Sequence, residues 1–300
     1  MGSQNREKLN WLERNLPEGR VVDAGWFERH GLSRQLRRKY VLNGWLLSPA
    51  RGVYRRPGPS DKKEPLAWQQ LVTSLNDLLN MPVSAGGRTA LELQGFAHYL
   101  TASGPREVHL YTNEDLPGWV SHVPVDAQLV VHNALRLFRR GEIPLFKDKT
   151  AAPPSPSPPS PSSPPPPPLP APPPPAGASV VQRLPAGPWN RPLTMSLPER
   201  AILELLDEVP ERETFHQADV LMEGLRTLSP QRLRALLLDC KNVKVKRLFF
   251  WFAERHNHAW LQKLDRSGID LGKGKRLLVR GGKLDPKYNI TVPETLDAGA

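Results

Sequence analysis

The stretch SRQLRRKYVLNGWLLSPARGVYRRPG, residues 33–58, carries seven Lys and Arg residues and no Asp or Glu. In its first half, Leu36 and Tyr40 recur at a helical spacing. At about 100° per residue, Arg34 and Arg38 fall opposite that apolar stripe. The stretch therefore predicts a helix with one face for its own core and one cationic face.

The residues around this helix predict a winged helix-turn-helix over residues 1–60. Helical periodicity over 4–16 and 24–30 gives two preceding helices, and Asp23 and Ser33 are preferred N-cap residues for the second and third. After the third helix, the strand-like runs WLL and GVYRR are joined by SPAR, which indicates a hairpin. Three helices and a hairpin within sixty residues are typical of this DNA-binding unit.

A helix with these side chains suits the major groove of duplex DNA. Arginine guanidinium groups pair with guanine, an amide suits adenine, and arginines of a hairpin would meet phosphates. The predicted DNA-contacting residues are Ser33, Arg34, Gln35, Arg37, Arg38 and Lys39 in the helix, and Arg51, Arg55 and Arg56 in the hairpin. The alternatives are a solvated basic face used for protein contacts, and RNA as the partner.

Composition agrees with a polyanionic partner. The 300 residues have a formal net charge of +11 and a pI near 9.9. A single cysteine, Cys240, excludes an internal disulfide and a cysteine-rich metal site. The start is polar and no apolar run reaches the roughly 18 residues of a membrane span, so we expect a cytoplasmic protein without membrane contact.

The whole chain predicts an α+β protein in which the winged helix-turn-helix precedes a larger mixed α/β domain. Residues 61–150 form its first part, with helices over 66–80 and 88–97 and strands over 107–112 and 128–133. Residues 151–178 are rich in proline, which favours a disordered, extended polyproline II segment. The tract is either an insertion within one domain or a linker between two.

Residues 179–300 form the second part, predicted to be helical with C-terminal strands. A helix opens at SLPERAILELLDEV with a capping box from Ser196 to Glu199, and LSPQRLRALLLDCK and VKVKRLFFWFAERHNHAWLQKL give further helices. KRLLV at 275–279 and YNITV at 288–292 are predicted strands. LFFWF is predicted to be core.

A second basic region runs from 231 to 283, with fourteen Lys and Arg residues against four Asp and Glu. Its candidate surface for an anionic partner is Lys241, Lys244, Lys246 and Arg247. The alternative is an ordinary solvated surface.

The residues make no positive case for catalysis, a cofactor or a metal. SAGGRTALELQG lacks the spacing and the Lys-Ser/Thr pair of a phosphate-binding loop, so we interpret it as a turn into a capped helix. His256 and His258 are two residues apart and point in different directions on a helix. We therefore expect that the protein is not an enzyme.

Several stretches resemble the AbiEi family of antitoxins. GRVVDAGWFERHGLSRQLRRKYVLNGWLLSPARGVYRRPG is similar to the family's N-terminal winged helix, and GGRTALELQGFAHYL and EVHLYT to its second domain. SLPERAILELLDE at 196–208 resembles a further family stretch with a Ser-x-Pro-Glu-Arg-Ala core. The proline-rich tract departs from the family pattern.

The resemblance implies the antitoxin of a bacterial abortive-infection, type IV toxin–antitoxin pair. It implies a winged helix that binds inverted repeats in its own promoter and represses the operon, by a dimer or by two monomers. The partner would be an AbiEii-like nucleotidyltransferase toxin, countered by the larger domain without a stable complex. The alternatives are a winged-helix protein that shields the toxin's RNA substrate, an unrecognised nuclease, and a scaffold whose proline-rich tract is a ligand.

Overall fold

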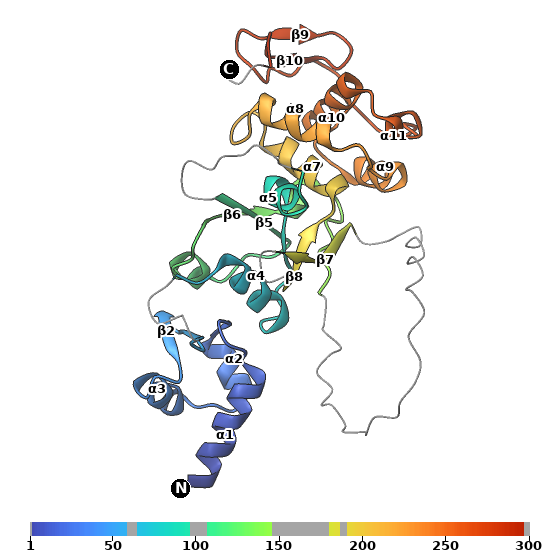
Figure 1. Ribbon diagram of the computed structural model, residues 1–300. Helices are drawn as coiled ribbons and strands as arrows, with labels where there is room; N and C mark the ends of the chain where they lie inside the picture. The colour runs from blue at the N-terminus through green and yellow to red at the C-terminus, as the bar shows by residue number, and fades with distance from the viewer. Residues whose placement is uncertain (1, 59–64, 97–106, 146–179, 187–190, 297–300) are drawn as a thin grey trace, which may run out of the picture.

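The computed structural model describes residues 2–58, 65–96, 107–145, 180–186 and 191–296. The predicted polyproline II tract at 151–178 lies outside the described residues. Within the described ranges, the N-terminal helices lie at one end of the molecule and a C-terminal β-hairpin at the other, with a five-stranded sheet between them (Figure 1).

The N-terminal unit combines three helices with a three-stranded antiparallel sheet in the order β1-β3-β2. Its elements are α1 (Gly2–Asn15), β1 (Val21–Asp23), α2 (Ala24–Arg29), α3 (Arg34–Leu42), β2 (Leu47–Ala50) and β3 (Val53–Arg55). The predicted caps are confirmed, since the Asp23 carboxylate accepts the backbone N–H of Trp26 at 2.7 Å and the Ser33 hydroxyl accepts that of Leu36 at 3.3 Å. The three predicted helices and the hairpin are present, and β1 is an addition that the sequence did not reveal.

The N-terminal unit packs directly on the next part of the chain. Helix α4 (Trp68–Asp77) contacts β1, and its Ser74 hydroxyl accepts the backbone N–H of Val21 at 3.0 Å. An ion pair of 3.7 Å joins Arg20 to Asp77. Val21 and Val53 belong to the same buried cluster as the central sheet, so the two parts share apolar contacts.

The central sheet has the strand order β6-β5-β4-β8-β7. Its elements are β4 (Val83–Ala85), α5 (Gly87–Leu93), β5 (Glu107–Thr112), the 3-10 helix η1 (Gly118–His122), β6 (Gln128–Asn133), α6 (Ala134–Leu137), β7 (Val181–Ala186) and β8 (Arg191–Ser196). Strands β4 and β8 pair in parallel at Ala85 and Met195. Segments on both sides of residues 146–179 therefore form one sheet, as the insertion hypothesis requires.

The C-terminal part is mainly helical and ends in a hairpin. It comprises α7 (Pro198–Glu208), α8 (Phe215–Gly224), α9 (Pro230–Asp239), α10 (Val243–His256), α11 (Ala259–Gln262), β9 (Lys283–Asp285) and β10 (Ile290–Val292). Helix α7 packs against α5 and α10. Phe249, Phe250 and Phe252 are buried, which confirms that LFFWF is mostly core.

Two local predictions were wrong. The helix at 198 has Leu197 as its N-cap, and the Ser196 hydroxyl instead donates to the Glu204 carboxylate at 3.1 Å, so the capping box is absent. KRLLV is not a strand, because the N–H groups of its Leu278 and Val279 donate to the side-chain hydroxyl of Thr291 rather than to a backbone ladder. The strand that pairs with β10 lies later, at β9.

Among the described residues, no helix combines the length and the apolar character required to cross a bilayer.

Candidate nucleic-acid interface

Helix α3 presents a cationic face because its opposite face is anchored in the N-terminal core. Leu32 and Tyr40 are buried, and Leu36 is half-buried beside them. Four polar side chains of the predicted interface are exposed on this helix: Arg34, Gln35, Arg38 and Lys39. Arg51, in the turn between β2 and β3, is exposed as well.

Arg37, by contrast, points into the N-terminal unit. Only 3% of it is exposed, and its guanidinium donates to the Leu32 carbonyl at 3.1 Å and to the Glu28 carboxylate at 3.1 Å. The same group lies over the rings of Phe27 and Tyr54, at 5.9 and 5.7 Å from their centroids. Arg37 therefore joins α3 to α2 and the sheet, and it is not available to DNA.

The other two hairpin arginines also face the protein. Arg55 is 4% exposed. Arg56 donates to the carbonyls of Glu13 and Leu16 at 2.9 and 3.3 Å and pairs with Glu18 at 3.3 Å, which ties β3 to the end of α1. Of the three hairpin arginines in the predicted interface, Arg51 is the one whose side chain is exposed.

The sequence interpretation missed two apolar side chains beside this face. Leu42 is 76% exposed and Trp45 is 44% exposed. Leu42 follows Arg34 and Arg38 at intervals of four residues, so the three side chains form one outward stripe. The spacing was readable in the sequence, but a leucine in a helix is ordinarily assigned to the core.

The second predicted cationic surface does not form. Lys246 and Arg247 are buried at 5% and 2% exposure. The Lys244 amine donates to the carbonyls of Asp207 and Val209 at 2.6 and 2.8 Å, and the Lys241 amine donates to that of Leu135 at 2.5 Å. These cations donate hydrogen bonds to backbone carbonyls of neighbouring segments. The four side chains therefore do not form a common surface for an anionic partner.

The Ser-Leu-Pro-Glu-Arg-Ala stretch at the start of α7 forms a buried polar cluster. Glu204 accepts hydrogen bonds from the Arg200 guanidinium at 2.7 Å, from the Ser196 hydroxyl, and from the backbone N–H of Gly87 at 2.9 Å. A Cβ on Gly86 would lie 2.3 Å from this carboxylate, so glycine is required there. Burial raises the pKa of Glu204, and Arg200 opposes that rise. The cluster joins α5, β8 and α7.

A second buried cluster joins β5 and β6 to the segment after α7. His109 Nδ1 lies 3.0 Å from His132 Nε2, and Glu213 lies 3.1 Å from the Arg88 guanidinium. Burial is the main cause of three shifted values: the pKa of Glu213 rises to about 7, that of His109 falls to about 3, and that of His132 falls to about 4. Both histidines are therefore neutral at physiological pH.

Neither cluster is arranged as a metal site. Within the described part of the chain, no group of three or more His, Cys, Asp or Glu side chains could hold a metal ion. The thiol of Cys240 is buried, and burial raises its pKa to about 11, which keeps it protonated and unreactive.

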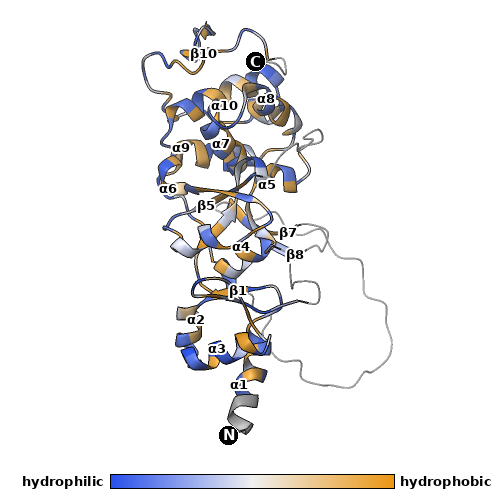
Figure 2. Ribbon diagram, turned by 90° about the vertical axis from the view of Figure 1, so that its left-hand side faces the viewer, coloured by the Kyte–Doolittle hydropathy of each residue, from blue (hydrophilic) through white to orange (hydrophobic). Residues whose placement is uncertain are grey.

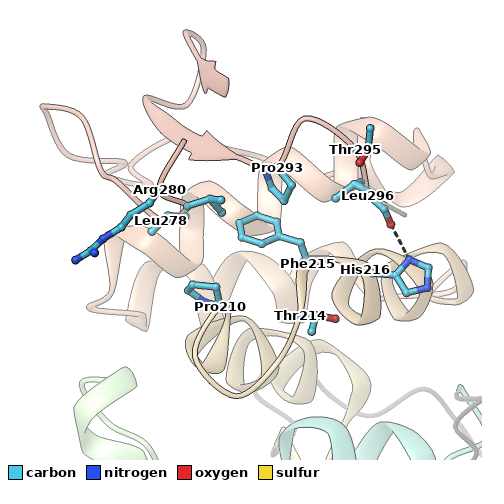
Figure 3. Close-up of a pocket in the computed structure, with 10 residues that line it drawn as sticks. Pro210, Thr214, Phe215, His216, Leu278, Arg280, Pro293, Thr295 and Leu296 are labelled. Carbon is cyan, nitrogen blue, oxygen red and sulfur yellow. Dashed lines mark hydrogen bonds between the residues drawn. The ribbon is translucent and has the colours of Figure 1, made fainter. Parts of the chain in front are cut away.

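A pocket of about 340 Å³ lies between α8 and the segments on either side of the C-terminal hairpin. Phe215, Leu278 and Pro293 line it, and His216 on its rim pairs with the Leu296 carbonyl (Figure 3). The lining is mainly apolar and lies far from α3 (Figure 1). It adds nothing to the cationic interface.

Two family models match the chain. Residues 5–102 match the N-terminal domain of AbiEi antitoxin transcriptional regulators, and residues 178–293 match the AbiEi antitoxin of type IV toxin–antitoxin systems. Together they span most of the chain on both sides of the proline-rich tract. The chain belongs to the AbiEi family of antitoxin transcriptional regulators.

A solved structure shares the fold. The crystal structure of the RV2827C protein from Mycobacterium tuberculosis aligns with a TM-score of 0.54 at 14% sequence identity, over 99% of this chain and 93% of that one. At this identity the likeness concerns the fold alone. The comparison with curated proteins finds no match.

Proposed function

We propose that the protein represses its own promoter by binding duplex DNA through a winged helix-turn-helix formed by residues 1–60. The observation that carries this proposal is the outward stripe of α3, where Arg34 and Arg38 are exposed opposite buried Leu32 and Tyr40. The order of helices and strands, in which α3 is followed along the chain by the hairpin whose turn exposes Arg51, is the order a winged helix requires.

The proposed contacts are Ser33, Arg34, Gln35, Arg38 and Lys39 on α3 and Arg51 on the hairpin. One such unit covers little DNA, so two copies would occupy two half-sites of an inverted repeat. They would bind either as a dimer or as two monomers that assemble on the operator.

Replacing Arg34 and Arg38 by Ala tests the proposal. Each substitution should weaken binding to the DNA upstream of the protein's own reading frame by about 1–3 kcal/mol if the arginine pairs with a guanine. Gel-shift titration and a promoter-fusion reporter measure the two consequences, affinity and repression. The control is Lys8→Ala with Arg14→Ala, which removes two exposed cations of α1.

Arg51→Ala should act differently, because phosphate contacts carry no sequence information. It should lower affinity for operator and unrelated DNA equally and reduce the salt dependence by about one unit of slope. Unchanged operator binding in all three α3 and hairpin variants would refute the DNA-binding assignment.

We further propose that residues 61–300 counter a nucleotidyltransferase toxin encoded beside this protein, without a stable complex and without catalysis by this chain. Membership of a family of type IV antitoxins supports this role. Co-expression with the neighbouring reading frame tests it: the Arg34→Ala, Arg38→Ala variant should lose repression and still rescue growth. A variant that loses both together would tie toxin control to DNA binding.

RNA binding by the winged helix is the competing function. Competition between operator duplex and structured RNA for wild-type protein separates the two, because our proposal requires the duplex to be preferred at physiological salt.

A further inference from the structure

Residues 272–283, here named the basic loop, lie at the C-terminal end of the molecule and run into β9, whose first residue is Lys283. The loop contains five cations and no Asp or Glu. All five are exposed: Lys273, Lys275, Arg276, Arg280 and Lys283. Their side chains make no hydrogen bond or ion pair with any residue that the structure describes.

Buried Arg247 and half-buried Asn289 hold the backbone of this loop and of Leu271, the residue before it. The Arg247 guanidinium donates to the carbonyls of Leu271 and Gly274 at 2.7 and 2.8 Å. The N–H of Arg276 donates to the Asn289 carbonyl at 2.8 Å. Because the carbonyls turn inward to these donors, the loop has a defined path with its cationic side chains outside.

The charges of the loop also have no acidic counterpart within it, whereas several other exposed cations of the C-terminal part do have one. Lys287 and Arg266, for example, both pair with Glu254, at 2.6 and 2.9 Å. A concentration of unpaired positive charge on a fixed loop attracts the phosphates of a nucleic acid, because binding releases condensed counterions.

We propose that the basic loop is a second nucleic-acid-binding surface that contacts the sugar–phosphate backbone. Its one strongly exposed apolar side chain is Leu277, at 68%. That is too little for a protein interface, which depends on a desolvated apolar centre. Arg280 lies at the edge of the neighbouring apolar pocket, and its guanidinium extends away from the other residues that line the pocket (Figure 3).

The position of the loop separates it from α3. Helix α3 and the hairpin that follows the loop lie at opposite ends of the molecule, with the five-stranded sheet between them (Figures 1 and 2). The two surfaces therefore engage different nucleic-acid segments, and one protein molecule holds both at once. This goes beyond repression through the N-terminal unit.

The test uses the full-length protein with Lys273, Lys275, Arg276 and Arg280 each replaced by Gln. Fluorescence anisotropy measures its binding to a single-stranded RNA of about 30 nucleotides and to an unrelated DNA duplex over a range of salt. RNA affinity should fall by about tenfold or more, and the log–log salt slope should flatten by up to about 3, at roughly 0.7 per lost contact. The duplex arm shows which nucleic acid supplies the phosphates.

The matched control removes the same charge elsewhere, with Arg136, Arg140, Arg226 and Lys263 replaced by Gln, all exposed. It should bind RNA as the wild type does. Circular dichroism and thermal melting verify that both variants fold. Equal RNA binding by the loop variant and this control would overturn the proposal. A second contrary result would be that polyglutamate binds the wild type as tightly as RNA does and that the loop substitutions abolish this binding too.

The Arg34→Ala, Arg38→Ala variant distinguishes this inference from the proposed repression. It should keep RNA binding, and wild-type protein that holds operator duplex at α3, with no duplex in excess, should still capture labelled RNA. If α3 does not bind DNA, the RNA measurements on the loop variant still decide the role of the loop.

Discussion

Arg37 and Arg38 are adjacent in the sequence and lie in opposite environments. Arg38 is exposed on the outer face of α3, whereas Arg37 is 3% exposed between the rings of α2 and the sheet. A rotation of about 100° per residue separates them, and Glu28 with the Leu32 carbonyl satisfies the buried charge. A cation in the sequence therefore belongs to the proposed DNA interface only where no internal acceptor binds it.

Leu42 extends the cationic stripe with an apolar side chain that would contact the methyl group of a thymine. Leu42→Ala should weaken operator binding by about 1 kcal/mol, without affecting unrelated DNA. Operator thymines are then replaced by uracil one at a time, which removes the methyl group. At one position the replacement should lower the affinity of the wild type by the same amount, and it should not lower the affinity of Leu42→Ala further. Additive losses in gel-shift titrations would contradict the contact.

Glu213 gives a pH-dependent prediction, because burial raises its pKa from 4.5 to about 7. Between these two values the unfolded chain loses this proton and the native protein keeps it, so its contribution to stability falls as the pH rises. Glu213→Gln should match the wild type near pH 4.5 and exceed it by up to about 3 kcal/mol at pH 8.

Urea unfolding from pH 4.5 to 9 measures this difference. His109 and His132, whose pKa values fall to about 3 and 4 in the native state, are mostly neutral there above about pH 5 and titrate alike in the unfolded state of both proteins, so their contributions cancel over that range. Glu211→Gln, at an exposed neighbour, is the control for removing a glutamate charge from this segment. A stability difference that is constant over this range would contradict the assignment.

At the scale of elements, the start of α7 depends on a buried ion pair in place of a capping box. Ser196 and Arg200 both donate to Glu204, and Arg200 also donates to the Glu142 carbonyl at 2.9 Å and lies 5.1 Å from the Phe138 ring centroid. The sequence pattern for a cap was present, but the Ser196 hydroxyl donates to the buried Glu204 carboxylate instead of accepting an N–H group of the helix end.

Removing Arg200 should reveal the unfavourable free energy of burying Glu204 without a partner. Arg200→Met should destabilise the protein by about 3–5 kcal/mol, because Glu204 stays buried without its cation. Arg200→Met with Glu204→Gln should lose less than the sum of the single substitutions, with a coupling of about 1–3 kcal/mol in urea unfolding. Strict additivity would show that the two side chains act independently.

At the scale of the whole molecule, strands from both sides of the proline-rich tract pair to form one sheet. Pairing of β4 with β8 brings Ala85 next to Met195 across a long interval of sequence. The N-terminal unit is fixed to the same body through α4, and the C-terminal hairpin lies at the far end (Figure 1).

Because closing a long loop costs free energy only with the logarithm of its length, deleting half of residues 151–176 should change the free energy of unfolding by less than about 1 kcal/mol. Urea unfolding measures this, and repression in the reporter assay should survive. A loss above roughly 2 kcal/mol would mean that the tract packs on the rest of the protein.

The sequence by itself determined the helices with strong periodicity, the caps at Asp23 and Ser33, the strands at 107–112 and 128–133, and the exposed arginines of α3. These features depend on neighbours within a few residues. Only the tertiary structure decided that Arg37, Arg55 and Arg247 turn inward and that β4 pairs with β8. The reason is physical: a buried cation needs acceptors, and a parallel strand needs a partner, that distant parts of the chain supply.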